Sequence, residues 1–183
     1  MSEQTINLEG GILYLTADTS LITEQLTSDF VPDRTGLALM DNISTDETTP
    51  GWTCFWYDDT LSKYCMIGLR DGVVKDNDIK NKGATVLVAG KSKGCGSSRE
   101  HAPYSELLAG IKLVVAESFE KIYAQNSRNI GLLLSTDFSL LDRIERGEAI
   151  PVEAFCDGLD QISADIVRMG GLFKSVSYTH LTL

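Results

Sequence analysis

The chain has 183 residues, of which 43% are hydrophobic and 23% are charged; this composition is typical of a folded globular protein, and the length is enough for one sizeable domain. Its formal net charge is -10 and its isoelectric point is near 4.6. We therefore expect no binding to nucleic acid or to an anionic membrane, because both depend on basic surfaces.

The cysteines predict a reducing compartment and no metal site in this chain. Four are present, with no C-x-x-C pair and no spacing with histidine that would favour a metal: Cys54, Cys65, Cys95 and Cys156. The N-terminus lacks the basic and apolar regions of a secretory signal, and no window approaches the roughly 18 apolar residues of a membrane span. We expect a cytoplasmic protein with reduced thiols.

The sequence of the N-terminal third predicts short strands, one helix and loops. Residues 10–32 predict a short strand, a capped helix in residues 20–26 and an exit marked by Pro32. Residues 35–52 predict a strand and then a polar loop that Pro50 and Gly51 close, and residues 63–72 predict another strand that ends in a turn. These early strands could add a barrel-like β portion.

From residue 83 onward, apolar and amphipathic segments alternate. Three apolar runs predict buried strands, and the segments between them predict helices. The strands are expected at residues 83–90, 111–116 and 130–135. This order predicts an α/β fold with a parallel sheet that helices cover. A short helix ending near Gly147 and a terminal segment at residues 164–173 follow.

One loop joins the first of these strands to the next helix and has the sequence GKSKGCGSSREHAP, residues 90–103. Gly94 and Gly96 allow positive φ and let the backbone approach a ligand, with Cys95 as a small residue between them. The following helix would aim unpaired N–H groups at the loop, so the sequence predicts a small anion-binding nest. Three basic side chains would add positive potential for an anionic substrate: Lys91, Lys93 and Arg99.

Several unrelated chemistries use glycine-rich loops, and the sequence argues against most of them. A P-loop requires a glycine where Thr85 stands, and a dinucleotide fingerprint requires one where Arg99 stands. A serine hydrolase would use Ser97 or Ser98 as nucleophile with His101 as base, but the loop has no G-x-S-x-G elbow. The alternative to an anion site is a capping turn, in which a serine caps the helix and the arginine lies on the surface.

Two motifs carry a resemblance to a known family. The loop motif GCGSSREHAP is followed by LLAGIKLVVAESFEKIYAQNSRNIGLL, and the motif DNISTDETTPG lies upstream at residues 41–51. Together they resemble the swivelling domain of the aconitase superfamily, and within it the family of 3-isopropylmalate dehydratase small subunits. The resemblance covers residues 38–174, which leaves residues 1–37 as an N-terminal extension and residues 175–183 as a tail of unclear role.

The resemblance implies a swivelling β/β/α domain that closes over a [4Fe-4S] cluster held by a larger partner subunit. It implies a hydro-lyase that isomerises a small 2-hydroxy polycarboxylate by dehydration and rehydration, with no cluster bound by this chain alone. It also implies that Ser97 is the catalytic base and that Ser98 and Arg99 bind substrate. Asp46 maps to an active-site acidic position in the upstream motif, although an aspartate in such a loop commonly forms only an Asx-turn.

The residue types suit this chemistry. A proton next to a carboxylate is weakly acidic, so its removal needs a well-placed base and electrostatic support for the developing charge. A serine alkoxide can serve only where backbone donors and a cation such as Arg99 stabilise it. Arg99 can also hold a carboxylate in a bidentate fork, which a lysine cannot reproduce.

Arg70 lies where proteins of this family place a substrate-discriminating loop. A cation there could select a carboxylate over an alkyl substituent, because burying an apolar group against an unpaired guanidinium is costly; the alternative is a turn arginine in solvent. The leading hypothesis is a small subunit that acts on 3-isopropylmalate. Citrate, homoaconitate and methyl-substituted malate compete within the same chemistry, and a non-catalytic carboxylate-binding module is the hypothesis from another class.

Overall fold

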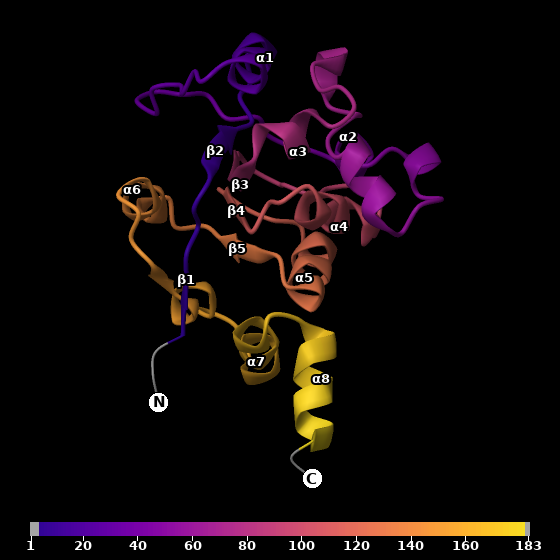
Figure 1. Ribbon diagram of the computed structural model, residues 1–183, viewed down its shortest axis with the longest axis vertical. Coiled ribbons are helices and arrows are strands. Elements are labelled where there is room, and N and C mark those ends of the chain that lie inside the picture. The colour runs from indigo at the N-terminus through magenta and orange to yellow at the C-terminus, as the bar shows by residue number, and fades with distance from the viewer. Residues whose placement is uncertain (1–3, 182–183) are drawn as a thin grey trace.

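A four-stranded parallel sheet forms the centre of the computed structural model, which describes residues 4–181 (Figure 1). Its strands lie in the order in which they occur along the chain: β2 (Gly11–Tyr14), β3 (Ala84–Ala89), β4 (Leu113–Ala116) and β5 (Leu133–Ser135). Every residue of β3 and β4 is buried. Such uniformly apolar strands are typical of a parallel sheet that is covered on both faces.

The strand register divides the core into two layers. Leu13, Leu87 and Val114 are aligned across β2, β3 and β4 and pack on one face of the sheet. Val88 and Val115, one residue further along their strands, are aligned on the other face. This alternation is the two-residue period of a strand, and it gives each face its own apolar core.

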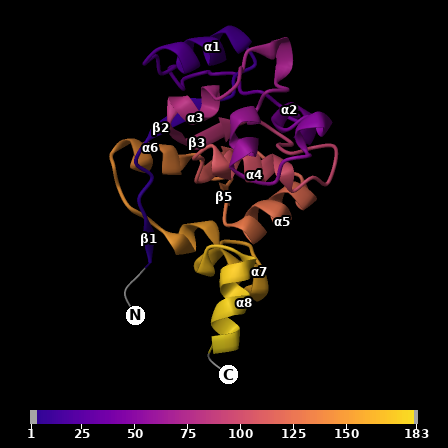
Figure 2. The ribbon, with the colours of Figure 1, turned by 45° about the vertical axis from the view of Figure 1, so that its right-hand side comes forward.

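Helices cover the first face, and Figure 1 shows α1 and α3 above the sheet. The helices that bury side chains in this layer are α1 (Thr19–Thr27), α3 (Asp78–Lys82), α4 (His101–Leu108) and α5 (Lys121–Ile130). Between α1 and α3 the chain forms short elements: α2 (Thr45–Thr48) and the 3₁₀ turns η1 (Gly51–Thr53), η2 (Asp59–Tyr64) and η3 (Arg70–Gly72). The turned view places α2 next to α4 (Figure 2).

The opposite face is covered by the C-terminal part of the chain together with the first strand. The elements here are β1 (Thr5–Ile6), α6 (Ser139–Glu145), β6 (Ile150–Pro151), η4 (Val152–Phe155) and α7 (Gln161–Met169). β1 and β6 pair antiparallel in a small second sheet. The last described element, α8 (Leu172–Leu181), packs beside α5 and α7 (Figure 1).

The parallel α/β arrangement predicted from the sequence is confirmed. The three predicted strands after residue 83 are β3, β4 and β5, and α4 and α5 connect them. The predicted early helix is α1, and its cap is the Asp18 carboxylate, which accepts a hydrogen bond from the Ser20 amide at 3.0 Å. Helix α6 likewise ends just before Gly147, as expected.

The predicted strand at residues 63–72 is wrong. The segment consists of the end of η2, a turn and η3, and most of its backbone hydrogen bonds are local, apart from the one that the Met66 amide donates to the Thr48 carbonyl at 2.8 Å. Met66 and Asp71 have φ of 63° and 58°, a left-handed conformation that no strand contains. In the region 35–52 the described chain forms isolated strand pairings, α2 and the start of η1, and between residues 4 and 181 the strands make two sheets and no barrel.

The segment before residue 38 is joined closely to the rest of the fold. β2 is an edge strand of the central sheet, and β1 pairs with β6 from the far end of the chain. The division at residue 38 stays a prediction. Of the predicted tail, residues 175–181 lie within α8, and the last two residues lie outside the described part. Among the described helices, none is long and apolar enough to cross a membrane.

Candidate active site

The glycine-rich loop leaves β3 at the carboxyl edge of the sheet and runs to α4, and the upstream motif lies directly against it. Cys95 and Ser44 form an isolated parallel bridge. The Thr45 amide donates to the Cys95 carbonyl at 2.8 Å, and the Gly94 amide donates to the Ile43 carbonyl at 2.8 Å. The two motifs, some fifty residues apart in sequence, therefore form one structural unit.

Gly94 is required by close approach as well as by backbone conformation. Its φ is +86°, and a Cβ atom at this position would lie 2.1 Å from Cγ of Tyr123. Gly96 also has a positive φ, of +94°, but the nearest atom to its Cβ position is 3.7 Å away. The Gly94 N–H is already bound to a carbonyl, so this residue lets the loop pack on α5 and offers no donor to an anion.

Arg99 and Asp46 bring the two motifs together through side chains. Nη1 of Arg99 lies 2.5 Å from Oδ1 of Asp46 and donates to the Thr49 carbonyl at 3.1 Å. The hydrogen bond with Asp46 raises the pKa of Arg99. Within residues 4–181 the Nη2 and Nε groups of Arg99 make no hydrogen bond, so one edge of the guanidinium is open to a carboxylate.

Ser97 and Ser98 are exposed, and only their backbones are held. The Ser97 amide donates to Oγ1 of Thr45 at 3.1 Å, and the Ser98 carbonyl accepts from Asn126 at 3.2 Å. Neither hydroxyl makes a hydrogen bond in the described part of the chain, and α4 begins without a side-chain cap. The capping-turn alternative therefore finds no support at these serines.

His101 opens α4 and faces an aromatic neighbour. Its ring centroid lies 5.1 Å from that of Tyr57 in an edge-on contact, and its carbonyl accepts from the Thr49 hydroxyl at 3.4 Å. Tyr57 also donates to the Glu100 carboxylate, and burial together with this contact raises the pKa of Tyr57. These contacts fit a histidine that orients the start of α4.

Arg70 lies on the other side of α2, where it binds a carboxylate that the sequence did not indicate as a partner. Its Nε donates to Oε1 of Glu47 at 2.7 Å, and its Nη2 donates to the Asp41 carbonyl at 2.7 Å. Ser44 and Glu47 form a capping box at the start of α2. The Ser-x-x-Glu spacing in the upstream motif is the sequence signal for this arrangement. Arg70 is thus neither a free turn arginine nor a direct neighbour of Asp46.

The expected positive potential is smaller than the loop sequence indicates. Lys91 is exposed and lies 3.9 Å from Glu117, in a weak ion pair. Lys93 is completely buried against Glu106 and faces no solvent. The prediction that both lysines face an anionic substrate is wrong for Lys93, because its side chain turns into the core beneath the loop. Arg99 is the basic residue of the loop that remains at the site.

The cysteines do not fit a [4Fe-4S] cluster. Cys65 and Cys156 are buried, Cys54 and Cys95 are half-buried, and all four are free thiols. In the described part of the chain no group of three or more histidine, cysteine or acidic side chains could hold a metal ion. Cys95 donates to the Asn42 carbonyl at 3.3 Å, and burial raises its pKa. Cys95 therefore packs within the loop and offers no thiolate.

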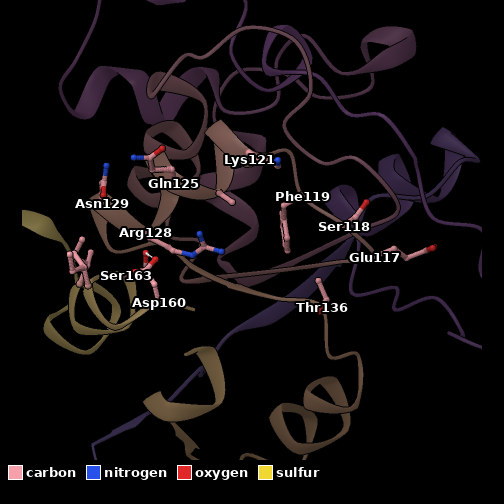
Figure 3. A pocket seen from close by; sticks show the side chains of 13 residues that line it. Glu117, Ser118, Phe119, Lys121, Gln125, Arg128, Asn129, Thr136, Asp160 and Ser163 are labelled. Atoms are coloured by element: carbon pink, nitrogen blue, oxygen red, sulfur yellow. Dashed lines mark hydrogen bonds between the residues drawn. The ribbon is translucent and has the colours of Figure 1, made fainter. Parts of the chain in front are cut away.

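A cleft of about 740 Å3 lies beside this site and was not predicted (Figure 3). It follows the carboxyl ends of β4 and β5 and is lined by Phe119, Arg128 and Thr136, with Asp160 from the start of α7. Burial lowers the pKa of Arg128, and the nearby Asp160 opposes this change. None of the three residues of the Ser-Ser-Arg motif lines the cleft, so the predicted site is on an open face of the protein and not in this hollow.

A parallel α/β domain that carries a Gly-Ser-Ser-Arg loop against a second acidic motif is a swivelling domain of the aconitase type. The sequence pattern of the aconitase C-terminal domain family matches residues 60–136. The chain belongs to the family of 3-isopropylmalate dehydratase small subunits. This confirms the family that the two sequence motifs predict.

The relatives and the structural neighbour agree on this family. The small subunit of 3-isopropylmalate dehydratase from Oleidesulfovibrio alaskensis is 35% identical over 151 residues, which span 74% of this chain and 88% of that protein. The one from Endomicrobium trichonymphae is 40% identical over 112 residues, 61% of this chain and 66% of that protein. The crystal structure of 3-isopropylmalate dehydratase from Methanocaldococcus jannaschii matches with a TM-score of 0.59 and 28% identity, and the match covers 78% of this chain and 90% of that one.

Proposed function

We propose that this chain is the small subunit of a hydro-lyase that moves the hydroxyl group of a 2-hydroxy polycarboxylate to the neighbouring carbon, with 3-isopropylmalate as its substrate. The observation that carries the proposal is the joining of the two motifs. Ser97, Arg99 and Asp46 lie on one open face, held together by hydrogen bonds between the loop and α2. The names of the relatives support the choice of substrate.

Ser97 is the proposed base. Its hydroxyl is exposed and makes no hydrogen bond in the described part of the chain, so it can approach the carbon that loses a proton. The unpaired N–H groups in the first turn of α4 and the Arg99 guanidinium would stabilise negative charge on its oxygen. The open edge of Arg99 and the Ser98 hydroxyl would hold a substrate carboxylate, with Asp46 fixing the direction of the guanidinium.

The partner proposed for this chain is a large subunit that holds a [4Fe-4S] cluster. The four cysteines of the small subunit do not fit such a cluster, and the proposed steps here belong to this chain's own residues. The exposure of Ser97, Ser98 and Asp46 supports a site that a second protein surface completes. The free thiols support a reducing compartment, for which we propose the cytoplasm.

Arg70 is proposed to influence the substituent that the substrate carries. Because Glu47 neutralises part of its charge, Arg70 in this arrangement attracts an additional carboxylate weakly, which supports a substrate with an alkyl group. A substrate such as citrate or homoaconitate would gain from an Arg70 that leaves Glu47. The assay must therefore compare substrates with an alkyl group and substrates with an additional carboxylate.

The test is to express the chain with the large subunit from the same organism, purify the complex without oxygen, and assay 3-isopropylmalate, citrate and homoaconitate. We expect turnover of 3-isopropylmalate, and we expect Ser97→Ala to abolish it while the complex still elutes as one species. Ser139→Ala, at the exposed start of α6 on the other side of the sheet, is the matched control and should keep full activity. A complex that binds these acids and turns over none of them would instead support a carboxylate-binding module.

A further inference from the structure

A charged network is buried directly beneath the active-site loop. The side chains of Lys93 and Glu106 are both 0% exposed, and Nζ of Lys93 lies 2.8 Å from Oε1 of Glu106 in an ion pair that lacks the angles of a hydrogen bond. The Tyr123 hydroxyl donates to the other oxygen of Glu106 at 2.5 Å. The Lys93 ammonium also lies 4.8 Å from the centre of the Tyr123 ring. Loop, α4 and α5 thus meet at one buried group of charges.

Stability alone does not account for this network. Removing two charges from water is costly, and apolar side chains of similar size in their place are often neutral or stabilising. Among the residues that the structure describes, no other charged side chain makes an ion pair with Lys93 or Glu106. Cys65 lies near the network, and its burial together with the charge of Glu106 raises the pKa of its thiol. The charges must therefore have a role other than stability, and the contacts of Lys93 indicate which one.

Lys93 holds α2. Its Nζ donates to Oγ1 of Thr48 at 3.1 Å, and the same hydroxyl donates to the Ser44 carbonyl at 3.2 Å. Ser44 is the cap of α2 and Thr48 is its last residue, so the ammonium is attached to the helix that carries Asp46. The opposite end of this chain of contacts is Glu106 on α4, the helix that follows the Ser-Ser-Arg motif.

The backbone of Lys93 is fixed at the same time. Its N–H donates to the Ser118 carbonyl at 3.0 Å, and its carbonyl accepts from the Glu120 amide at 3.0 Å. The next residue, Gly94, packs against the Tyr123 ring. The backbone of Lys93 is therefore held by the segment between β4 and α5, and its ammonium is held by Glu106 of α4 and Thr48 of α2.

We propose that Lys93, held in place by Glu106, is a positioning residue that fixes α2 and its Asp46 relative to Ser97 and Arg99. It acts through Thr48 and touches no substrate. The inference rests on the proposed function for its catalytic consequence, but the geometric consequence can be measured in this chain alone. Without the ammonium, α2 keeps its contacts with the loop backbone and the bond from the Met66 amide to the Thr48 carbonyl, but it loses the side-chain bond that ties Thr48 to the charged network beneath the loop.

The test separates position from stability with an apolar replacement of the whole network. The triple variant Lys93→Met, Glu106→Met and Tyr123→Phe leaves no member of the network buried and unpaired, and the Thr48 hydroxyl keeps its bond to Ser44. We expect its urea midpoint to stay near that of the wild type. Amide hydrogen exchange in residues 45–49 and 94–99 should become about tenfold faster, while exchange in β3 and β4 stays unchanged.

Activity of the assembled complex supplies the second measurement. We expect kcat of the triple variant to fall about 10- to 100-fold with KM changed by less than about threefold, because misplacement affects the reacting geometry more than ground-state binding. Thr48→Val should give the same loss, the two changes should not add, and Thr48→Ser should retain activity. If the triple variant does not fold, Thr48→Val alone decides.

The outcomes are distinguishable. Unchanged exchange in residues 45–49 and 94–99 together with unchanged kcat in the triple variant or in Thr48→Val would overturn the positioning role and leave the network as packing. Faster exchange in those segments supports it even when the wild-type complex turns over no hydroxy acid. In that last case the proposed function fails and the geometric inference stands.

Discussion

The ion pair between Arg99 and Asp46 is on the surface, where it contributes little to stability. Asp46 is 63% exposed, and exposed pairs of this kind typically stabilise a protein by about 0–1 kcal/mol. Through Nη1 the Arg99 guanidinium nevertheless binds Asp46 and the Thr49 carbonyl, and in the described part of the chain its Nη2 and Nε groups have no partner. This use of a fork with several donors points to binding chemistry and not to stability.

Arg99→Lys tests this view, since a lysine keeps the charge but cannot fill three directions at once. We expect the free energy of unfolding to change by less than about 1 kcal/mol. We expect kcat/KM of the assembled complex to fall by about 100-fold, measured by steady-state kinetics. Arg34→Lys is the control, because Arg34 also binds two carboxylates, Asp142 and Glu145, away from the site. Equal losses in both variants would contradict the assignment.

The two loop glycines differ in how much space they have, which gives a matched pair of variants. An alanine at Gly94 would meet the Tyr123 ring in addition to its unfavourable φ, and we expect a loss of about 3 kcal/mol in the free energy of unfolding. An alanine at Gly96 has room and suffers only the backbone strain, for an expected loss of about 1–2 kcal/mol. Urea denaturation measures both. A Gly94 variant no less stable than the Gly96 variant would show that the loop can move away from α5.

The candidate site could be predicted from the sequence where its residues are neighbours along the chain. Ser97, Ser98 and Arg99 are adjacent, so a motif identifies them together. Lys93 shows the limit, because a lysine between polar residues and glycines is typical of an exposed loop. Its burial depends on Glu106 in the second turn of α4 and on Tyr123 of α5, which lies under the loop; both are consequences of packing that sequence spacing alone does not give.

At the scale of elements, the edge of the central sheet shows how the N-terminal segment is held. Tyr14 of the edge strand β2 has no strand on its outer side, and the Gln25 side chain of α1 takes that place. The Tyr14 amide donates to Oε1 of Gln25 at 2.9 Å, and Nε2 of Gln25 donates to the Tyr14 carbonyl at 2.9 Å. Gln25 is 1% exposed. One amide side chain thus completes the strand pairing and joins α1 to the sheet.

Gln25→Leu removes this pairing at nearly constant volume. Two buried backbone groups of Tyr14 would lose their partners, and we expect the free energy of unfolding to fall by about 2–4 kcal/mol. The control is Gln161→Leu at the exposed start of α7, for which we expect a change below about 0.5 kcal/mol. A Gln25 effect no larger than the control would mean that residues before 38 do not contribute to the stability of the domain.

The four strands of the central sheet could be predicted, and the turns at residues 63–72 could not. Residues 84–89 and 113–116 are continuous apolar runs with β-branched residues, and their burial on two faces agrees with that pattern. Residues 63–72 have apolar side chains too, but Cys65, Met66 and Leu69 reach the core from turns. A short apolar run reports burial, and burial is shared by a strand and by a compact turn.

At the scale of the whole molecule, the architecture explains why the site is open. The loop after β3 and the segment after β4 both emerge at the carboxyl edge of the sheet, and the upstream motif packs over them from the first helical layer. The two apolar cores lie behind this edge, so the side chains of the proposed site project from a stable base. An exposed site on a rigid domain fits a protein that closes onto a second subunit.

Buried tyrosines make the stability of the whole molecule decrease at alkaline pH. Burial raises the pKa of Tyr14 to about 12, and the adjacent Glu145 carboxylate adds to this change. Burial likewise raises the pKa of Tyr123, with Glu106 contributing. In the unfolded chain a tyrosine loses its proton near pH 10, so above about pH 10 the unfolded state is charged while the folded state still holds the proton. The free energy of unfolding must therefore fall as pH rises from about 10 to about 12, and the stabilisation is complete below that range.

Tyr14→Phe isolates one part of this dependence, because it removes the titrating hydroxyl and only a long hydrogen bond of 3.4 Å to Glu145. We expect the wild type and the variant to have similar urea midpoints near neutral pH, and the wild type to lose stability more steeply once the pH exceeds about 10. The ultraviolet absorbance of tyrosinate, followed on the same samples, should rise in the wild type together with unfolding. Parallel stability curves for the two proteins above that pH would mean that the Tyr14 hydroxyl ionises in the folded state as readily as in the unfolded chain, and that water reaches it at the edge of the sheet.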